Sequence, residues 1–293
     1  MLSFLTDDKK IIDDGMEAAL VSFCGAQDEI VEAMRYSALG GKRIRGILTI
    51  EFAKMLGCIT EDVLPYALGI ECVQAYSLVH DDLPCMDNDD MRRGKPSCHI
   101  AFGESTAVLA GDALLTHAFS VIAESKAAES HPERAVKAIA KLADYAGYRG
   151  MVGGQVLDLS AAEKEVSADE LATIHALKTA ALMKASAAMG CIAAGIEDDA
   201  PEMNDAVLYA GRIGLAFQII DDILDAQSTA EELGKSVGSD ARDGKTTFLS
   251  FMSADEARSY ARRVTDAAID AVAGYHGSET LVALAEWLLT RRK

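Results

Sequence analysis

Aspartates gather at two distant points of this chain, each at the end of an apolar stretch. The first group lies in residues 81–95, which read DDLPCMDNDDMRRGK, and the second comprises Asp221, Asp222 and Asp225. Ionised carboxylates beside an apolar helix are costly unless a cation pairs with them. Carboxylate oxygens are ligands that Mg²⁺ prefers, and Mg²⁺ is often shared with substrate phosphates. We therefore expect the two groups to hold magnesium ions and, through them, a diphosphate.

The first group follows a segment, residues 63–82, that is apolar nearly all round and predicts a buried helix. Pro84 disfavours a helical conformation at Leu83, so the helix should end or kink there. Asp81 and Asp87 would not share a face of a straight helix at ~100° per residue. The break lets Asp87 fold back toward Asp81, which would complete one multi-carboxylate metal site.

Basic residues follow the first group and also form a separate segment earlier in the chain. Arg92 and Arg93 suit phosphate oxygens, because arginine stays charged and offers forked donors. A calcium loop is excluded, since Arg92 and Cys98 occupy its glycine and closing-acid positions. The earlier segment, residues 40–45, reads GGKRIR. Its glycines and the following helix start could receive a diphosphate, and a glycine cap with a solvated basic turn is an equal alternative.

The second group lies in residues 202–226, a predicted helix that apolar side chains wrap on most sides. Asp221 and Asp225 are one turn apart, where like charges destabilise a helix, so a divalent cation is the simpler account. Residues 238–247 nearly spell a nucleotide-binding loop, but the spacing of Gly238 and Gly244 is one residue too long, Asp240 and Asp243 would repel phosphates, and a helix rather than a strand precedes it. We expect instead a loop that presents Lys235 and Lys245 to a phosphate.

Composition and periodicity predict that these segments belong to an all-α protein. Half of the 293 residues are apolar and only five are proline, which favours helices. Two glycines, Gly153 and Gly154, indicate close helix packing ahead of room for an apolar ligand. The final residues 291–293 are all basic, as suits a helix C-terminus. We expect helices at 7–38 (two, with a turn near Gly25), 47–56, 63–82, 104–128, 132–159, 167–194 (with Lys178 and Thr179 in mid-helix), 202–226, 254–274 and 279–291.

The overall charge and the cysteines exclude several classes of protein. A net charge of -18 argues against nucleic acid and anionic membrane as partners, because both require a basic surface. The six cysteines show no zinc spacing and are expected to be reduced thiols. Residues 1–15 lack the pattern of a signal peptide, and no apolar stretch is expected to reach the ~20 residues of a membrane span. We expect a cytoplasmic protein without membrane insertion.

Taken together, these motifs resemble those of the trans-isoprenyl diphosphate synthases, specifically the short-chain bacterial type. Asp81-Asp82 through Asp87 resembles the family's first aspartate-rich motif with two extra residues, and residues 221–225 match its second. The resemblance spans almost the whole chain, so it implies one domain over residues 1–293. It also implies an all-α fold, a single large helical bundle around a deep central cavity, and a homodimer. The implied reaction, part of isoprenoid biosynthesis, condenses isopentenyl diphosphate with an allylic diphosphate.

The resemblance also implies a role for individual residues. The implied cofactor is Mg²⁺, as three ions, for which Mn²⁺ would substitute. Gln74 stands where many bacterial relatives have histidine and others glutamine. The implied catalytic residues are Asp81, Asp82, Asp87, Lys178, Asp221 and Asp222, and the implied metal ligands are Asp81, Asp82, Asp87, Asp221 and Asp225. Isopentenyl diphosphate would contact Gly41, Lys42, Arg45, Gln74 and Arg93; the allylic diphosphate would contact Arg92, Lys178, Thr179, Gln218, Lys235 and Lys245, with Phe217 also in the substrate site.

Product length is expected to depend on the helix that ends at Asp81. Tyr76 lies five residues earlier, ~7.5 Å lower along the helix, and small Ser77 follows it. In the family, an aromatic residue there together with the two-residue insertion is typical of farnesyl (C15) synthases. Smaller residues there are usual in geranylgeranyl (C20) synthases. The resemblance thus implies a farnesyl diphosphate synthase, with a C20 synthase, a terpene cyclase and a silent partner subunit as alternatives in that order.

Overall fold

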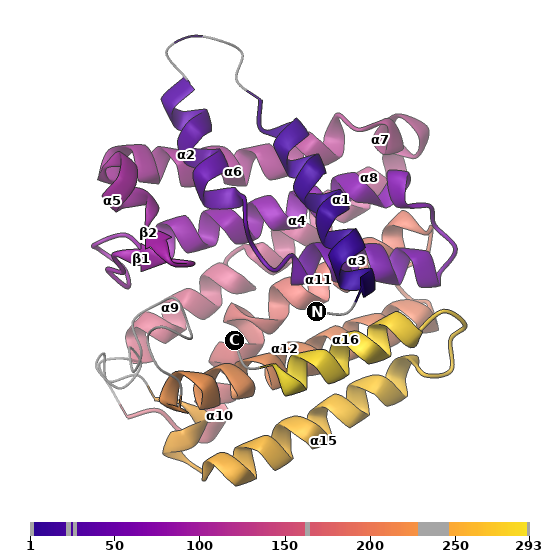
Figure 1. Ribbon diagram of the computed structural model, residues 1–293. Helices are drawn as coiled ribbons and strands as arrows, with labels where there is room; N and C mark the ends of the chain where they lie inside the picture. The colour runs from indigo at the N-terminus through magenta and orange to yellow at the C-terminus, as the bar shows by residue number, and fades with distance from the viewer. Residues whose placement is uncertain (1–2, 22–24, 26–27, 162–164, 228–245, 292–293) are drawn as a thin grey trace.

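The computed structural model describes residues 3–21, 25, 28–161, 165–227 and 246–291. Helices make up nearly all of the regular structure in these ranges, as the composition predicts (Figure 1). The elements are α1 (Ser3–Ala19), α2 (Asp28–Ala38), α3 (Ile44–Met55), α4 (Thr60–Asp81), β1 (Met91–Arg92), β2 (Lys95–Pro96), α5 (Cys98–Phe102), α6 (Glu104–Ala123), α7 (Lys126–Ser130), α8 (Pro132–Ala146), α9 (Met151–Ala161), α10 (Ala168–Lys178), α11 (Ala180–Ala193), α12 (Pro201–Gln227), the 3₁₀ turn η1 (Phe248–Ser250), α15 (Ala254–Val272) and α16 (Glu279–Thr290).

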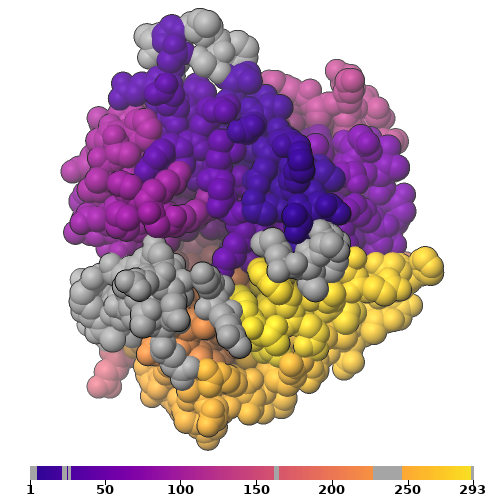
Figure 2. Space-filling view, in the orientation of Figure 1, coloured from indigo at the N-terminus to yellow at the C-terminus, as the bar shows by residue number. Residues whose placement is uncertain are grey.

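The helices form one large bundle with α11 at its centre. This helix contacts α3, α4, α8 and α12, and nearly all of its residues are buried. Small residues allow the close approach, since a Cβ at Gly190 would lie 2.5 Å from the backbone oxygen of Thr49. The surface is hollowed between the indigo-to-magenta half of the molecule and the orange-to-yellow half (Figure 2).

The C-terminal end of α4 and the C-terminal end of α12 pack in two different hydrophobic clusters. The larger one includes the buried faces of α3, α4, α6, α8 and α11. The smaller one gathers Ile219, Ile220 and Ile223 of α12 with Phe248 and Ala261. In Figure 1, α4 and α12 both run toward the same side of the molecule. Each aspartate group therefore lies at the end of a helix with its own apolar support.

Several predicted helix boundaries are wrong, and each break has a local cause. The segment 132–159 divides into α8 and α9 at Gly147, whose backbone is extended, and 104–128 divides into α6 and α7. The segment 167–194 breaks at Thr179 rather than continuing through it. A hairpin of β1 and β2 was not predicted. Its two-residue turn is Arg93–Gly94, both with positive φ (55° and 76°), as tight antiparallel turns require.

The helix α6 corrects the expectation that no stretch is apolar and long enough to span a membrane. Among the described residues it alone meets that test by length and composition, and 33% of its most apolar stretch is buried within the chain. It packs against α4, α2, α5 and α8, while Val108 and Leu109 remain exposed. Part of its apolar surface is therefore left uncovered by this chain.

Candidate active site

The first aspartate group folds back on itself, as its spacing predicts. The helix α4 ends at Asp81, and the backbone N–H of Asp87 donates to the carbonyl oxygen of Asp81 (2.8 Å). Burial raises the pKa of Asp81 to about 6; the approach of Lys178 opposes this rise, and the negative charge of Asp87 adds to it. Asp81 is thus a half-buried carboxylate to which an added cation would be favourable.

Asp82 and Arg92 form an ion pair that the sequence did not predict. The Nε of Arg92 donates to both carboxylate oxygens of Asp82 (3.0 and 3.1 Å), and its Nη2 donates to Oδ1 as well. Nη2 also lies 3.5 Å from Asp89. The pair ties the β1–β2 hairpin to the end of α4. One predicted metal ligand and one predicted diphosphate contact therefore bind each other in this structure.

In the second group, Asp222 joins the helices around it. It accepts from Nε2 of Gln218 (3.0 Å) and from the backbone N–H of Phe248 (2.9 Å), and it is buried. The hydroxyl of Thr179 donates in turn to Gln218 (3.1 Å). Asp222 thus holds α12 against the α10–α11 junction and η1. Asp225, one turn beyond Asp221, is buried too.

Asp221 is partly exposed and pairs with an arginine that is distant in the sequence. Its side chain is 41% exposed, and Nη2 of Arg291 donates to its Oδ1 (2.6 Å). The guanidinium of Arg291 also covers the ring of Phe217 at 3.9 Å from its centre and donates to the Phe217 carbonyl (3.0 Å). Arg291 therefore has specific partners, Asp221 and Phe217, in addition to its position at the end of a helix. No local pattern distinguishes it, because its partner lies far away in the sequence.

Lys178 lies at the junction of α10 and α11, not in mid-helix as predicted. Its ammonium group bonds Asp158 of α9 (2.6 Å). A Cβ at Gly154 would lie 2.2 Å from the backbone nitrogen of Lys178, so this glycine lets α9 approach the junction. That confirms close packing as the role of Gly154. Asp158 had no signal in the sequence, since it is an ordinary polar residue of a helix.

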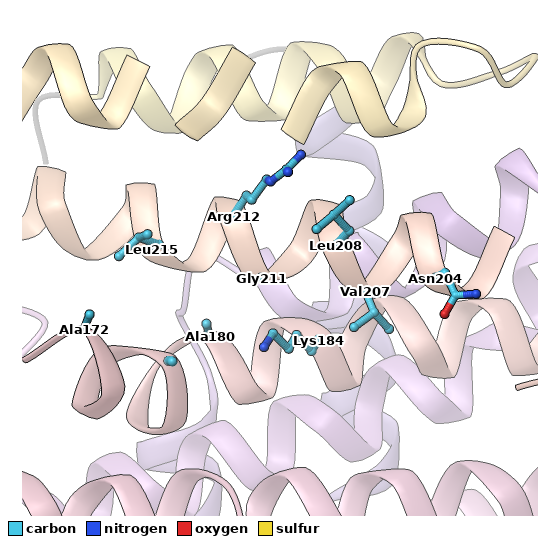
Figure 3. Close-up of a pocket in the computed structure, with 10 residues that line it drawn as sticks. Ala172, Ala180, Lys184, Asn204, Val207, Leu208, Gly211, Arg212 and Leu215 are labelled. Atoms are coloured by element: carbon cyan, nitrogen blue, oxygen red, sulfur yellow. The ribbon is translucent and has the colours of Figure 1, made fainter. Parts of the chain in front are cut away.

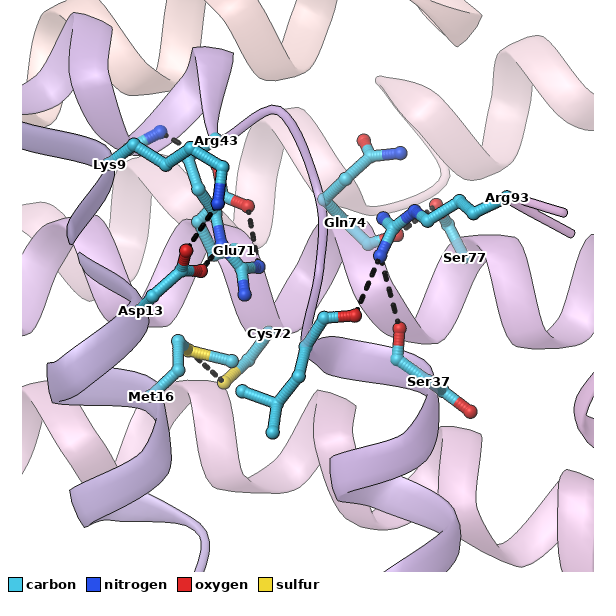
Figure 4. A network of polar contacts seen from close by, with 12 residues as sticks. Lys9, Asp13, Met16, Ser37, Arg43, Glu71, Cys72, Gln74, Ser77 and Arg93 are labelled. Carbon is cyan, nitrogen blue, oxygen red and sulfur yellow. Dashed lines mark hydrogen bonds and ion pairs between the residues drawn. The ribbon is translucent and has the colours of Figure 1, made fainter. Parts of the chain in front are cut away.

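A second basic region combines the start of α3 with the turn of the hairpin. Arg93 lies over Gly41, where a Cβ would be 3.1 Å from its Nη2, and its Nη1 reaches the carbonyls of Ser37 and Leu39 (both 3.4 Å). Figure 4 shows Gln74 of α4 beside Arg93. The structure thus brings Gly41, Gln74 and Arg93 together. Lys42, next in sequence, is exposed.

Arg45 links this basic region to the second aspartate group. Burial lowers the pKa of Arg45 to about 10, while Glu71 and Asp221 oppose that shift by their negative charge. Its Nε is buried without a hydrogen-bond acceptor among the residues that the structure describes. A buried donor in this state is costly, and an anion would satisfy it. The region therefore suits a diphosphate, and the fully solvated alternative for residues 40–45 is wrong, because Arg43 is buried.

The residues expected to set product length lie in the last turns of α4. Tyr76 is buried, and its ring packs edge-on against His80 with 5.8 Å between the ring centres. The hydroxyl of Ser77 donates to the Gln74 carbonyl (3.0 Å). His80 contacts α6, because Gly111 leaves room for its ring. Two further predicted contacts, Lys235 and Lys245, lie outside the described residues.

The predicted metal ligands are all carboxylates, which suits Mg²⁺, but they do not form one cluster in this structure. Within the ranges that the structure describes, no three carboxylate, imidazole or thiol side chains form a group able to hold a metal ion. Two of the predicted ligands, Asp82 and Asp221, pair with Arg92 and Arg291 in this structure. Carboxylate oxygens are the ligand type that suits Mg²⁺. The residues that carry them lie on α4, on the loop after it and on α12.

A separate groove of about 390 Å³ lies between α10, α11 and α12 (Figure 3). Its walls are mostly apolar, with Lys184 and Arg212 among the residues that line it. No residue of either aspartate group lines it. The groove is therefore distinct from the candidate site.

The chain is similar to known proteins over most of its length. The sequence profile of the family described as polyprenyl synthetase matches residues 27–276. Farnesyl diphosphate synthase from Escherichia coli (strain K12) is 42% identical over 271 residues, which cover 90% of this chain and 90% of the relative. Geranylgeranyl diphosphate synthase from Cyanophora paradoxa is 40% identical over 294 residues, which cover 99% of this chain and 96% of the relative.

A similar solved structure is geranyltransferase from Helicobacter pylori, complexed with magnesium and isoprenyl diphosphate. It superposes with a TM-score of 0.89 at 30% identity and covers 99% of this chain and 98% of its own. The two sequence relatives differ in the product that their names state, at nearly the same identity.

Proposed function

Since this chain belongs to the polyprenyl synthetase family, we propose that it is a farnesyl diphosphate synthase. It would join isopentenyl diphosphate first to dimethylallyl diphosphate and then to geranyl diphosphate. The family makes it a short-chain prenyltransferase. The observation that supports the two-substrate site is the side chain of Arg45. Its buried Nε has no acceptor among the described residues, it lies close enough to Asp221 for their charges to interact, and it follows Gly41, over which Arg93 lies.

The allylic diphosphate is proposed to lie between the two aspartate groups. Asp81, Asp82, Asp87, Asp221 and Asp225 would hold magnesium, and bound Mg²⁺, as three ions or with Mn²⁺ in its place, would neutralise the departing diphosphate as a Lewis acid. Asp82 would reach the metal only if its pair with Arg92 opens. Arg92 would then be released to donate to the diphosphate.

The other allylic contacts are proposed to act from the α10–α11 junction and α12. Lys178, held by Asp158, would donate to the same diphosphate, and Thr179 and Gln218 would contact it from the chain that ends at Asp222. Phe217 belongs to this substrate site, and Lys235 and Lys245 complete it in the proposal.

The isopentenyl diphosphate is proposed to lie against the basic region. Gly41 offers a backbone without a side chain, and Lys42, Arg45 and Arg93 offer cations, with Gln74 as a neutral donor. The buried Nε of Arg45 would find its missing acceptor in a phosphate oxygen. This arrangement would keep the second diphosphate on the α3 side of the site, apart from the one that leaves.

The reaction would proceed in three changes of bonding. The C1–O bond of the allylic diphosphate breaks, and its electron pair leaves with the diphosphate oxygen. The double bond of isopentenyl diphosphate then attacks C1 through its C4. Loss of a C2 proton to the released diphosphate restores an alkene. Preorganised cations stabilise the leaving group, and apolar helix faces exclude the water that would otherwise capture the carbocation.

The whole chain is proposed to act as one domain in a cytoplasmic homodimer. The uncovered apolar face of α6, with Val108, Leu109 and the neighbouring Ile100 of α5, supports a protein interface rather than a surface in water. The described cysteines are all free thiols, which agrees with a reducing compartment. Neither nucleic acid nor membrane is a proposed partner.

Product sizing tests the proposed reaction and the product length together. The purified protein is incubated with Mg²⁺, isopentenyl diphosphate and each allylic primer, and the main product is expected to be C15. Tyr76→Ala should lengthen it, because removing a buried ring opens space along α4. Tyr148→Ala serves as a control, since Tyr148 is exposed, and should leave the product unchanged.

Two outcomes would contradict the proposal. If no primer were turned over, the proposed reaction would be wrong. A C20 product from the wild type, unchanged in Tyr76→Ala, would assign the protein as a geranylgeranyl diphosphate synthase and show that Tyr76 does not limit the chain.

A further inference from the structure

A buried glutamate lies beneath the basic loop of the proposed isopentenyl diphosphate site. Glu71 belongs to α4 and is 5% exposed. Its Oε1 accepts from the backbone N–H of Gly46 (2.9 Å), and its Oε2 lies 3.3 Å from Nη1 of Arg43. One carboxylate therefore ties the start of α3 to the helix that carries the first aspartate group.

Arg43 has an unusual backbone conformation in this loop. Its φ of 59° and ψ of 26° are left-handed, a region that residues with a side chain rarely adopt. The residue is only 2% exposed, and its Nε donates to Asp13 of α1 (2.8 Å). A residue in a sparsely populated conformation persists where its surroundings hold it. The carboxylates of Glu71 and Asp13 hold Arg43 in this conformation.

The conformation of Arg43 decides how its neighbours are presented. Figure 4 shows Arg43 turned toward Glu71 and Asp13 on one side of the loop, with Gln74 and Arg93 on the other. Lys42 precedes Arg43 and Arg45 follows it closely, so their backbone orientation depends on the left-handed residue between them. Lys42 is exposed, and Arg45 lies close enough to Asp221 for their charges to interact.

We propose that Glu71 is a positioning residue for the isopentenyl diphosphate site, acting through Arg43 and the N–H of Gly46 to fix the loop that carries Gly41, Lys42 and Arg45. Glu71 itself does not contact the substrate. The inference rests on the proposed function, because it assumes that this loop receives the second diphosphate. It adds a residue that the resemblance to the family did not assign.

Two roles of Glu71 predict opposite effects on substrate affinity. If it were only a negative charge near the site, its removal would weaken repulsion of a diphosphate and lower the KM for isopentenyl diphosphate. As a positioning residue, its removal leaves Arg43 with one carboxylate instead of two and loosens the loop. The KM should then rise. The sign of the change therefore separates the two roles.

The test uses Glu71→Gln, which keeps the size of the side chain and an acceptor for Gly46 but loses the charge. We expect the KM for isopentenyl diphosphate to rise about tenfold, while the KM for the allylic substrate stays within about twofold. Glu51→Gln is the matched control, since Glu51 is also buried and pairs with Lys54 (2.9 Å) without touching the loop. It should leave both KM values unchanged.

A double-mutant cycle with Arg43→Gln tests whether Glu71 acts through Arg43. Residues that act together give non-additive effects, so the double variant should raise the KM little more than either single one. Arg43→Gln also remains informative if Glu71→Gln does not fold, which thermal unfolding would reveal. In that case Arg43→Gln alone must raise the KM for isopentenyl diphosphate selectively.

The inference and the proposed function fail in different ways. A wild type that condenses no isopentenyl diphosphate would overturn the function. An active wild type with an unchanged or lowered KM in Glu71→Gln, or equal changes for both substrates, would overturn the positioning role while the function stands. Additive effects in the double variant would likewise overturn the route through Arg43.

Discussion

Charged residues around the site are mostly matched in pairs, and the pairing separates two kinds of aspartate. Asp82 and Asp222 are buried and bonded to Arg92 and to Gln218 with the Phe248 N–H, so they hold elements in place. Burial raises the pKa of both Asp81 and Asp82, but at Asp82 the hydrogen bonds from Arg92 oppose the rise. At Asp81 only the charges of Lys178 and Arg92 oppose it, and the ammonium of Lys178 bonds Asp158 instead. The ionised form of Asp81 therefore destabilises the fold, and a bound cation would offset this effect.

This difference predicts opposite effects of Asp81→Asn on activity and stability. Loss of the charge should lower kcat by about 10²–10³-fold, the range for removing one electrostatic stabiliser. The pKa of Asp81 rises from 3.8 to about 6, so the folded state favours the neutral form, and wild-type stability falls as the pH rises through that interval. In metal-free buffer at pH 7, the variant should unfold at an equal or higher temperature.

The matched control is Asp90→Asn, the same change at an exposed position of the same loop. It should keep near-normal kcat and thermal stability. Near-normal turnover in Asp81→Asn would contradict its role as a metal ligand, and a clearly lower unfolding temperature would contradict the stated cost of its charge.

At the scale of elements, the junction of α9, α10 and α11 places Lys178 and Thr179 between the two aspartate groups. The break at Thr179 depends on partners in other helices, namely Gln218 of α12 and the backbone beside Gly154 of α9. These contacts turn a segment with continuous helical periodicity into two helices. The ammonium of Lys178 can then bond Asp158 while its charge acts on Asp81.

Gly154→Ala should disturb this junction. Its Cβ would lie 2.2 Å from the backbone nitrogen of Lys178, which cannot yield as a side chain can. We expect a lower unfolding temperature and a higher KM for the allylic substrate, with overpacking costing about 1–3 kcal/mol. Gly274→Ala is the control, because its Cβ would meet nothing within 4 Å, and it should be neutral. Equal stability of the two variants would show that α9 adapts freely.

Local signals account for what could be predicted at this scale. Pro84 and the spacing of Asp81 and Asp87 predict the folded-back loop, and apolar periodicity predicts α4 and α12. The break at Thr179, the pair of Asp221 with Arg291 and the burial of Arg43 depend on contacts between distant segments. Glu71 had a usable signal, because it is the only acid in the apolar stretch of residues 63–79. The same argument from burial cost that identified Asp81 applies to it.

Over the whole molecule, the charge is distributed so that an acidic protein can bind anionic substrates. The net charge is -18, yet Arg92 and Lys178 lie close enough to Asp81 to interact with its charge, and Arg45 does so with Asp221. Local cations decide the binding of a diphosphate more than distant surface acids do, because salt screens exposed charges beyond ~10 Å. On the same molecule, the exposed Val108 and Leu109 of α6 form an apolar patch.

From this patch we predict that the protein forms a dimer with α6 in the interface. Leu109 is 53% exposed on this helix, and Leu109→Asp would place an unpaired charge in the proposed interface, where burial is costly. Light scattering after size exclusion should give a dimer for the wild type and a monomer for the variant. The variant should keep its helical circular dichroism, because an exposed side chain adds little to the core of one chain.

Leu208→Asp is the matched control, since Leu208 is 44% exposed on α12, in the other half of the bundle. It should remain a dimer, so the same chemical change would act only at α6. A wild type that is monomeric across a wide range of protein concentrations would contradict the dimer. A Leu109→Asp variant that dimerises like Leu208→Asp would assign the interface to another surface and leave the apolar face of α6 unexplained.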